Sequence, residues 1–285
     1  MLVLDRAREL ARQKGARVVF PEWDEPRIAD AARRLEAEGL AKPVPCADVS
    51  EAQVAALTQG RGLKEGIARR MLSRPMFRAV AMVAAGEADA MVAGAETATK
   101  KVLEAASIAI GPADGVGTAS SYFLMLFPDG REMIWADCAV NVAPDAGELA
   151  DIARASAATG RALLGDARVA LLSFSTGTSG AGTSVDLARE VAEATGFLGP
   201  VQADAALNAA IAAKKGLGAG DANVLVFPDL NAGNIAYKLA QELAGAQAIG
   251  PMLQGFAKPV CDLSRGASVD AVSYTHLTLP TIYSV

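Results

Sequence analysis

The stretch VALLSFSTGTSGAGTSVDLARE, residues 169–190, decides the fold class. Val169–Phe174 is a continuous apolar run with the length of a buried strand, and it passes into a loop rich in glycine and hydroxyl residues. A helical pattern, Val185–Thr195, follows the loop. A buried strand that leads through a short loop into a helix is the repeating unit of a mostly parallel sheet. We therefore predict an α/β protein.

The same alternation extends in both directions from this stretch. Strands are expected at Arg17–Phe20, Pro43–Cys46, Ala90–Ala93 and Asn223–Phe227. Helices are expected at residues 1–15, Pro26–Glu38, Arg61–Ser73, Met76–Ala85, Thr99–Ile110, Asp145–Leu164, Asp204–Lys215 and Gly233–Ala244. One segment differs: Thr118–Phe127 and Glu132–Val140 flank Pro128–Arg131, which indicates an antiparallel hairpin. Because the strand–helix alternation gives way to this hairpin after residues 111–115, we place a domain boundary near Gly115.

Composition excludes several classes of function. The chain has 285 residues, a hydrophobic fraction of 52% and a net charge of −5, with no basic stripe for nucleic acid and no stretch that could span a membrane. Its one histidine, His276, lies near the C-terminus, which argues against a Ser-His-Asp triad and against a histidine-bound zinc site. Cys46, Cys138 and Cys261 have no metal or redox spacing, so we expect no metal and a reducing, cytoplasmic setting.

Three loops that follow apolar runs are candidates for chemistry, because ligands of open α/β sheets bind at the carboxyl ends of strands. The loop 175–184 can cradle phosphate through backbone N–H groups, or it is simply a flexible surface loop. The loop 227–238 opens a helix, and a well-capped turn explains its polar residues without function. In the third, GPMLQGFAKPVCDLSRGASVD (250–270), Arg265 beside Gly266 suits an anion, or it is a solvated turn.

Longer stretches carry a resemblance to a known family. The segments PEWDEPRIADAARRLEAEGLAKPV (21–44), WADCAVNVAPDAGELADIA (135–153), VALLSFS with SGAGTSVDLARE, and above all NVLVFPDLNAGNIAYKLAQELAGAQAIGPMLQGFAKPVCDLSRGASVD (223–270) are similar to phosphate acetyltransferases. The resemblance covers the chain from about Leu4 to Asp270. It implies reversible acetyl transfer between acetyl phosphate and CoA, with inorganic phosphate as the other product and no cofactor, in a cytoplasmic homodimer.

The family's fold is two α/β/α three-layer lobes with mostly parallel sheets and an active-site cleft between them. On this chain the resemblance implies residues 1–115 with 252–285 as the first lobe and 116–251 as the second. The catalytic residues that it implies are Ser264 and Arg265, which contact the acyl phosphate, and a carboxylate base for which Asp270 is the candidate. The substrate-binding residues that we predict are Ser173, Ser175, Thr176, Ser179, Gly180, Asn231, Asn234 and Gly266.

The chain departs from the family pattern at several positions. Ala271 stands where the family has the second of two carboxylates, the one usually taken as the base, and Glu104 stands where many members have an arginine, with Lys100 and Lys101 a turn away. The end SYTHLTLPTIYSV (273–285) replaces a long amphipathic helix, and we interpret it as non-native from about Ala271. Two alternatives stay open: a non-catalytic acyl-CoA-sensing domain of the same fold, and a transferase for another short acyl chain such as butyryl.

Overall fold

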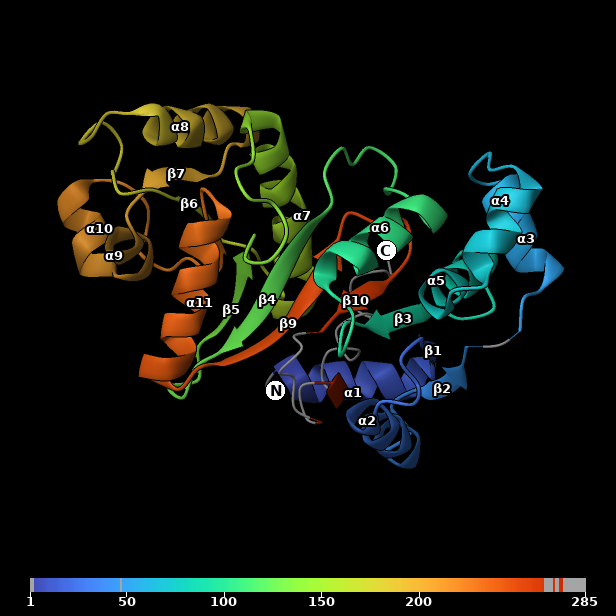
Figure 1. Ribbon diagram of the computed structural model, residues 1–285. Helices are drawn as coiled ribbons and strands as arrows, with labels where there is room; N and C mark the ends of the chain where they lie inside the picture. The colour runs from blue at the N-terminus through green and yellow to red at the C-terminus, as the bar shows by residue number, and fades with distance from the viewer. Residues whose placement is uncertain (1–2, 47, 264–268, 270–271, 274–285) are drawn as a thin grey trace. The chain divides into compact units, whose positions relative to one another are not determined.

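A computed structural model describes residues 3–46, 48–263, 269 and 272–273 (Figure 1). Contacts divide the chain into two compact units: one is Met1–Val116 with Gly250–Val285, and the other is Gly117–Ile249. In the described residues no helix combines the length and the apolar character needed to cross a membrane. The same residues contain no cluster of histidine, cysteine and acidic side chains that could hold a metal ion.

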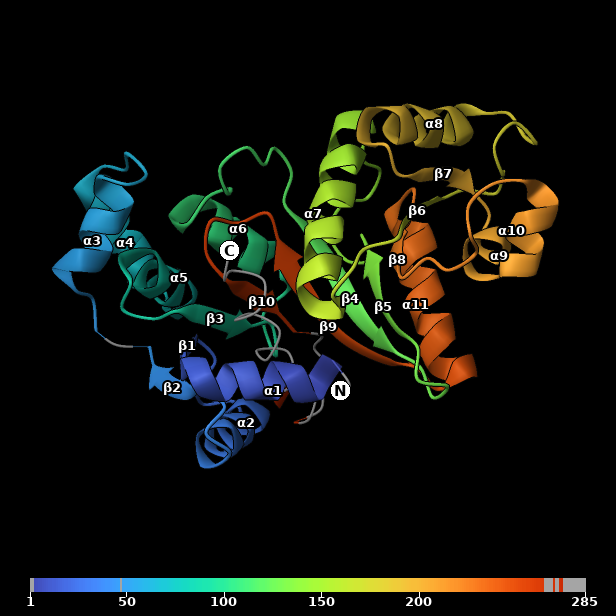
Figure 2. The same cartoon turned by 180° about the vertical axis from the view of Figure 1, so that it is seen from behind.

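The first unit is a mostly parallel sheet with helices on both faces. Its strands lie in the order β2-β1-β3-β10, all parallel, and β9 pairs antiparallel with β10. Figures 1 and 2 show α1 and α2 on one side of the strands and α5 and α6 on the other. The elements are α1 (Val3–Lys14), β1 (Arg17–Phe20), α2 (Pro26–Ala37), β2 (Lys42–Pro45), α3 (Glu51–Thr58), α4 (Glu65–Leu72), α5 (Pro75–Ala85), β3 (Ala90–Ala93), α6 (Thr99–Ala109), β9 (Gln247–Gln254), which begins in the second unit, and β10 (Val260–Asp262).

The second unit repeats the three-layer arrangement. Its strands lie in the order β4-β5-β8-β6-β7, and every pair except the β4–β5 hairpin is parallel. The elements are β4 (Ser120–Leu126), β5 (Glu132–Ala136), α7 (Ala146–Leu164), β6 (Val169–Leu172), α8 (Thr183–Thr195), β7 (Leu198–Val201), α9 (Ala203–Leu207), α10 (Ala209–Lys215), β8 (Val224–Val226) and α11 (Leu230–Ala244).

Successive side chains of these strands point to opposite faces of the sheet, so an apolar layer forms on each face. Side chains such as Trp135 and Leu225 belong to a buried cluster that also receives residues of α9, α10 and α11. Adjacent residues in each strand face the opposite side of the sheet. Val224, for example, packs against Gly160 of α7, where an added Cβ would lie 2.7 Å from the Val224 side chain. The sheet is therefore covered on both faces, as mostly parallel strands require.

The predicted elements are largely present, and three differences have local causes. The α3 helix was not predicted; Ser50 caps it by accepting from the Gln53 N–H. The single helix expected at Asp204–Lys215 is broken at Asn208, whose extended backbone and side-chain cap start α10 afresh. Helix α11 begins at Leu230 rather than Gly233, because Asp229 accepts from the Ala232 N–H.

Candidate active site

The predicted catalytic residues Ser264, Arg265 and Asp270 lie outside the described residues, as do the predicted substrate-binding residue Gly266 and the chain end from 274. What the structure describes is the strand that leads to them. Strand β10 ends at Asp262, and it runs parallel to β3, with Ala93 opposite Asp262. Parallel neighbours end at one edge of a sheet, and loops at that edge form ligand sites. The loops at the carboxyl edge of the first unit are therefore the candidate ligand site.

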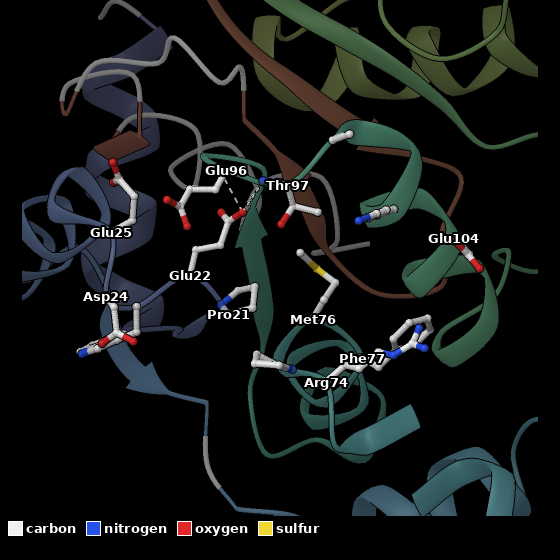
Figure 3. Close-up of a pocket in the computed structure, with 14 residues that line it drawn as sticks. Pro21, Glu22, Asp24, Glu25, Arg74, Met76, Phe77, Glu96, Thr97 and Glu104 are labelled. Carbon is white, nitrogen blue, oxygen red and sulfur yellow. Dashed lines mark hydrogen bonds between the residues drawn. The ribbon is translucent and has the colours of Figure 1, made fainter. Parts of the chain in front are cut away.

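A cavity of about 720 Å³ lies at this edge (Figure 3). Its walls are residues 21–25 after β1, residues 74–77 at the start of α5, and residues 96–98 with Lys101 and Glu104 from the loop and helix after β3. Acidic side chains outnumber basic ones in these walls. An anionic ligand that entered here would meet only two basic side chains in the described walls, Arg74 and Lys101.

The Glu22 carboxylate closes one wall of the cavity by accepting four backbone N–H groups. Oε2 accepts from Gly94 at 2.9 Å and Ala95 at 2.8 Å, and Oε1 accepts from Glu96 at 3.1 Å and Thr97 at 2.7 Å. Figure 3 shows this carboxylate pointing at the loop that follows β3. Successive N–H groups that point the same way form an anion-binding concavity. Here the protein's own carboxylate fills that concavity, so it is not a free phosphate site.

Asp262 is the second carboxylate at this edge, and its side chain has no exposed surface. Its Oδ2 accepts a short hydrogen bond from the Thr99 hydroxyl, at the first residue of α6. No described residue donates a hydrogen bond of normal geometry to Oδ1. Burial raises the pKa of Asp262 to about 7; the Thr99 hydroxyl and the Leu263 amide counteract this, and the Glu22 charge adds to it.

At the carboxyl edge of the second unit, the hydroxyl loop after β6 is held by its own hydrogen bonds. The Ser175 and Ser179 hydroxyls lie 3.2 Å apart, and the Thr176 N–H donates to Ser179 Oγ at 3.0 Å. The Thr176 hydroxyl donates to Gln202 Oε1 at 3.2 Å, and Lys215 Nζ donates to the same oxygen at 2.7 Å. Side-chain hydrogen bonds thus fold the loop back on itself and join it to Gln202.

The structure separates the predicted residues of this loop by exposure. Ser175 and Thr176 are buried, whereas Ser179 is exposed and Ser173 and Gly180 are half-buried. At Gly180 an added Cβ would lie 3.0 Å from the Ser175 side chain, so close packing disfavours a larger residue there. The buried hydroxyls shape the loop, and the outer residues are the ones that can meet a ligand.

The two predicted asparagines lie on α11, which starts at the same edge. Asn231 is exposed, while the Asn234 side chain donates to the Cys138 carbonyl at 3.1 Å. Gly233 permits this contact, because a Cβ there would come within 2.4 Å of the Asp137 carbonyl oxygen. Asn234 therefore joins α11 to the turn after β5, and Asn231 has the more exposed side chain of the two.

Sequence reasoning did not select Asp137, whose carboxylate organises the turn after β5. It accepts from the backbone N–H groups of Ala139, Val140 and Asn141 at 3.0, 3.2 and 2.9 Å, from the Ser121 hydroxyl and from the Asn141 side chain. The neighbouring Cys138 thiol is fully buried, and burial together with Asp137 raises its pKa well above its usual range. A thiol that resists ionisation is not a nucleophile, so Cys138 is a packing residue.

Glu22, Thr99 and Asp262 were also missed as site residues. Glu22 and Asp262 are polar residues that follow or end a short apolar strand, as at Phe20–Pro21–Glu22 and Val260–Asp262, whereas Thr99 is the first residue of α6. That signal was present in the sequence. The sequence did not show which of these residues would come into contact, because Thr99 and Asp262 are 163 positions apart.

Comparison with known proteins identifies relatives along nearly the whole chain. The sequence model of the phosphate acetyl/butaryl transferase family matches residues 45–278. The chain is 41% identical over 313 residues to the phosphate acetyltransferase of Paracoccus denitrificans, covering 98% of both. It is 39% identical over 304 residues to that of Pseudomonas aeruginosa, covering 93% of this chain but 43% of the relative, so the chain spans less than half the length of that protein.

A solved structure shares the fold. The phosphotransacetylase of Streptococcus pyogenes superposes with a TM-score of 0.90 at 33% identity, covering 99% of this chain and 98% of that one. The family assignment and the fold therefore agree.

Proposed function

Because the chain belongs to the phosphate acetyl/butaryl transferase family, we propose that it is a phosphate acetyltransferase: it interconverts acetyl phosphate plus CoA with acetyl-CoA plus inorganic phosphate. The observation that carries the proposal is the match to the Paracoccus denitrificans phosphate acetyltransferase, which extends over 98% of both chains. CoA enters as a substrate, and the reaction needs no further cofactor.

The chemical step that we propose is direct attack of the CoA thiolate on the acetyl carbonyl carbon. A C–S bond forms, the bond between the acetyl carbon and the bridging oxygen breaks, and phosphate leaves with that oxygen and the electron pair. A free thiol has a pKa of about 8.5, so a base must take its proton. Asp270 is our candidate for that base, since Ala271 stands where the family has its usual carboxylate.

In this proposal, Ser264 and Arg265 contact the acyl phosphate. The Arg265 guanidinium neutralises the charge that grows on the departing phosphate, and the Ser264 hydroxyl donates to a reacting oxygen. Ser173, Ser179, Gly180 and Asn231 bind substrate, and the buried Ser175 and Thr176 act by holding their loop in shape. Holding both substrates in one complex supplies proximity.

The test is thioester formation from acetyl phosphate and CoA, followed by absorbance. We expect CoA-dependent turnover, and we expect Arg265→Ala to reduce kcat/KM by at least about 100-fold, the scale of losing a charged transition-state partner. Binding of CoA without turnover would favour the acyl-CoA-sensing alternative.

Two further arms of this assay separate the remaining alternatives. Ala271→Glu restores the family's carboxylate, and if only this variant turns over, the wild-type chain is an enzyme that lacks its base. Comparing acetyl, propionyl and butyryl phosphate at equal concentrations identifies the acyl chain. Faster turnover of butyryl phosphate would contradict the acetyl assignment.

We also propose a cytoplasmic homodimer. The apolar side chains of Ile235, Leu239 and Leu243 recur every fourth residue along α11 and are 56%, 51% and 81% exposed, which supports association with a partner. Light scattering coupled to size exclusion gives the mass, and a monomer at micromolar concentration would contradict the dimer.

A further inference from the structure

Two carboxylates hold the loop Gly94–Thr99 from different strands. Glu22, just after β1, accepts the four consecutive N–H groups of residues 94–97. Asp262, the last residue of β10, accepts from the Thr99 hydroxyl at the end of the same loop. The loop is therefore fixed at both of its ends, and both anchors come from neighbours of β3 in the sheet.

Gly94 makes the second anchor possible. Its φ of +107° is a conformation that side chains rarely adopt, and a Cβ there would lie 2.4 Å from Asp262 Oδ1 and 2.7 Å from the Leu263 nitrogen. The parallel register explains the contact. Ala93 is opposite Asp262, so Gly94 and Leu263, the residues that follow the two strands, leave the sheet side by side. The backbone of this loop thus lies directly against Asp262 and Leu263.

From Leu263 the chain continues covalently into Ser264 and Arg265. We propose that Asp262, through Thr99, and Glu22 are positioning residues for acetyl transfer: they lock the loop Gly94–Thr99 against the end of β10 and so set the point from which the Ser264–Arg265 segment starts. This inference rests on the proposed function. Neither Asp262 nor Thr99 lines the cavity, so they act through other residues.

The energetics of Asp262 fit this role better than a purely stabilising one. No hydrogen bond of normal geometry reaches the buried Asp262 Oδ1 from the described residues, and a buried acceptor that is poorly satisfied lowers stability. The Glu22 charge adds an unfavourable interaction with an ionised Asp262. Places where a local rule of stability is broken are typically functional sites.

The experiment measures kcat and both KM values for three variants of the full chain. Thr99→Val removes the hydroxyl donor with little change of shape, Thr99→Ser keeps the donor, and Asp262→Asn removes the charge. We expect Thr99→Val and Asp262→Asn to lower kcat by about 10- to 100-fold with KM for CoA and for acetyl phosphate within about 2-fold, the effect of misplaced but intact catalytic groups. Thr99→Ser should retain kcat within about 2-fold of wild type.

A matched control separates positioning from loss of stability. Ser50→Ala removes the cap of α3 and the Ser50 hydrogen bond to Glu87, in the same unit but away from the cavity. It should lower the melting temperature and leave kcat unchanged. If Thr99→Val lowers kcat no more than Ser50→Ala does, or if Thr99→Ser fails to restore it, Asp262 and Thr99 are structural only and the inference is wrong.

Failure of the proposed function gives a different result. Absence of acetyl transfer in both the wild-type chain and the Ala271→Glu variant overturns the proposed function and this inference with it. Turnover that persists unchanged in Thr99→Val and Asp262→Asn overturns the inference alone. Should Asp262→Asn not fold, the Thr99→Val and Thr99→Ser pair decides the question.

Discussion

Asp262 couples the stability of the fold to pH. Burial raises the pKa of this carboxyl to about 7, so the folded chain favours its protonated form. A group whose pKa is raised on folding contributes stability that is fully present below the pKa of the unfolded chain, about 3.9, and is lost as pH rises through the folded value. For Asp262 the loss therefore falls between about pH 4 and pH 7.

Asp262→Asn should remove this pH dependence. From pH 5 to pH 8, we expect the variant to lose about 2–3 kcal/mol less of its free energy of unfolding than the wild type loses. Urea unfolding at the two pH values measures the difference. Asp89→Asn is the control, since the Arg17 side chain lowers the pKa of Asp89 and its effect falls below pH 4. Parallel wild-type and Asp262→Asn curves would contradict the raised pKa.

Gly94→Ala tests the close approach of the loop to Asp262. The substitution combines a strained φ of +107° with a Cβ placed 2.4 Å from a buried oxygen, so we expect it to destabilise the fold by about 3 kcal/mol or more. Gly86→Ala is the matched control, because Gly86 has a φ of +77° with no heavy atom within 4 Å. It should cost only about 1 kcal/mol. Equal losses in urea unfolding would show that the contact with Asp262 is not tight.

At the scale of single elements, helix boundaries follow from side-chain caps. Helix α7 begins with a complete capping box: Asp145 Oδ1 accepts from the Glu148 N–H at 2.9 Å, and Glu148 accepts from the Asp145 N–H at 2.9 Å. It ends at Gly165 in a left-handed conformation. These two signals are local, so the helix could be predicted almost to the residue.

Asp145→Ala should lower the free energy of unfolding by about 1 kcal/mol, because it leaves an N–H group of the first turn without its acceptor. Urea unfolding at neutral pH measures the change. Asp186→Ala, which removes an exposed first-turn acid of α8 that pairs with Arg189 but caps nothing, should change stability by less than about 0.5 kcal/mol. A loss at Asp186 as large as that at Asp145 would argue against the cap.

At the scale of the whole molecule, each unit is an α/β/α layer structure with polar loops at the carboxyl edge of its sheet. In both units a carboxylate satisfies several backbone N–H groups at that edge, Glu22 in the first and Asp137 in the second. These internal anions hold the turns in shape. In the proposed reaction, the substrate phosphate would therefore depend on side-chain cations and on the remaining N–H groups.

Binding of CoA can be tested apart from catalysis. CoA at 100 times its Kd should stabilise the folded chain by about 2.7 kcal/mol, which for a chain of this size raises the melting temperature by roughly 5–10 °C. Differential scanning fluorimetry across a CoA titration measures the shift, with pantetheine as the control that lacks the nucleotide. No shift at millimolar CoA would contradict both the transferase and the acyl-CoA sensor.

The sequence alone was sufficient for the α/β class, the β4–β5 hairpin and most helices, because apolar periodicity, glycine stops and caps act within a few residues. It also carried the family resemblance, since the matching residues are consecutive. The helical pattern gave one continuous helix at Asp204–Lys215, but the extended backbone of Asn208 divides it into α9 and α10.

Only the tertiary structure showed that Glu22, Thr99 and Asp262 converge on one loop. Their hydrogen bonds join positions more than 70 and more than 160 residues apart, and such contacts depend on which strands become neighbours in the sheet. The raised pKa of Asp262 arises in the same way, because burial is a property of the packed chain and not of the residue. The sequence determined which chemical groups the chain possesses, and packing determined which of them meet and in what ionisation state.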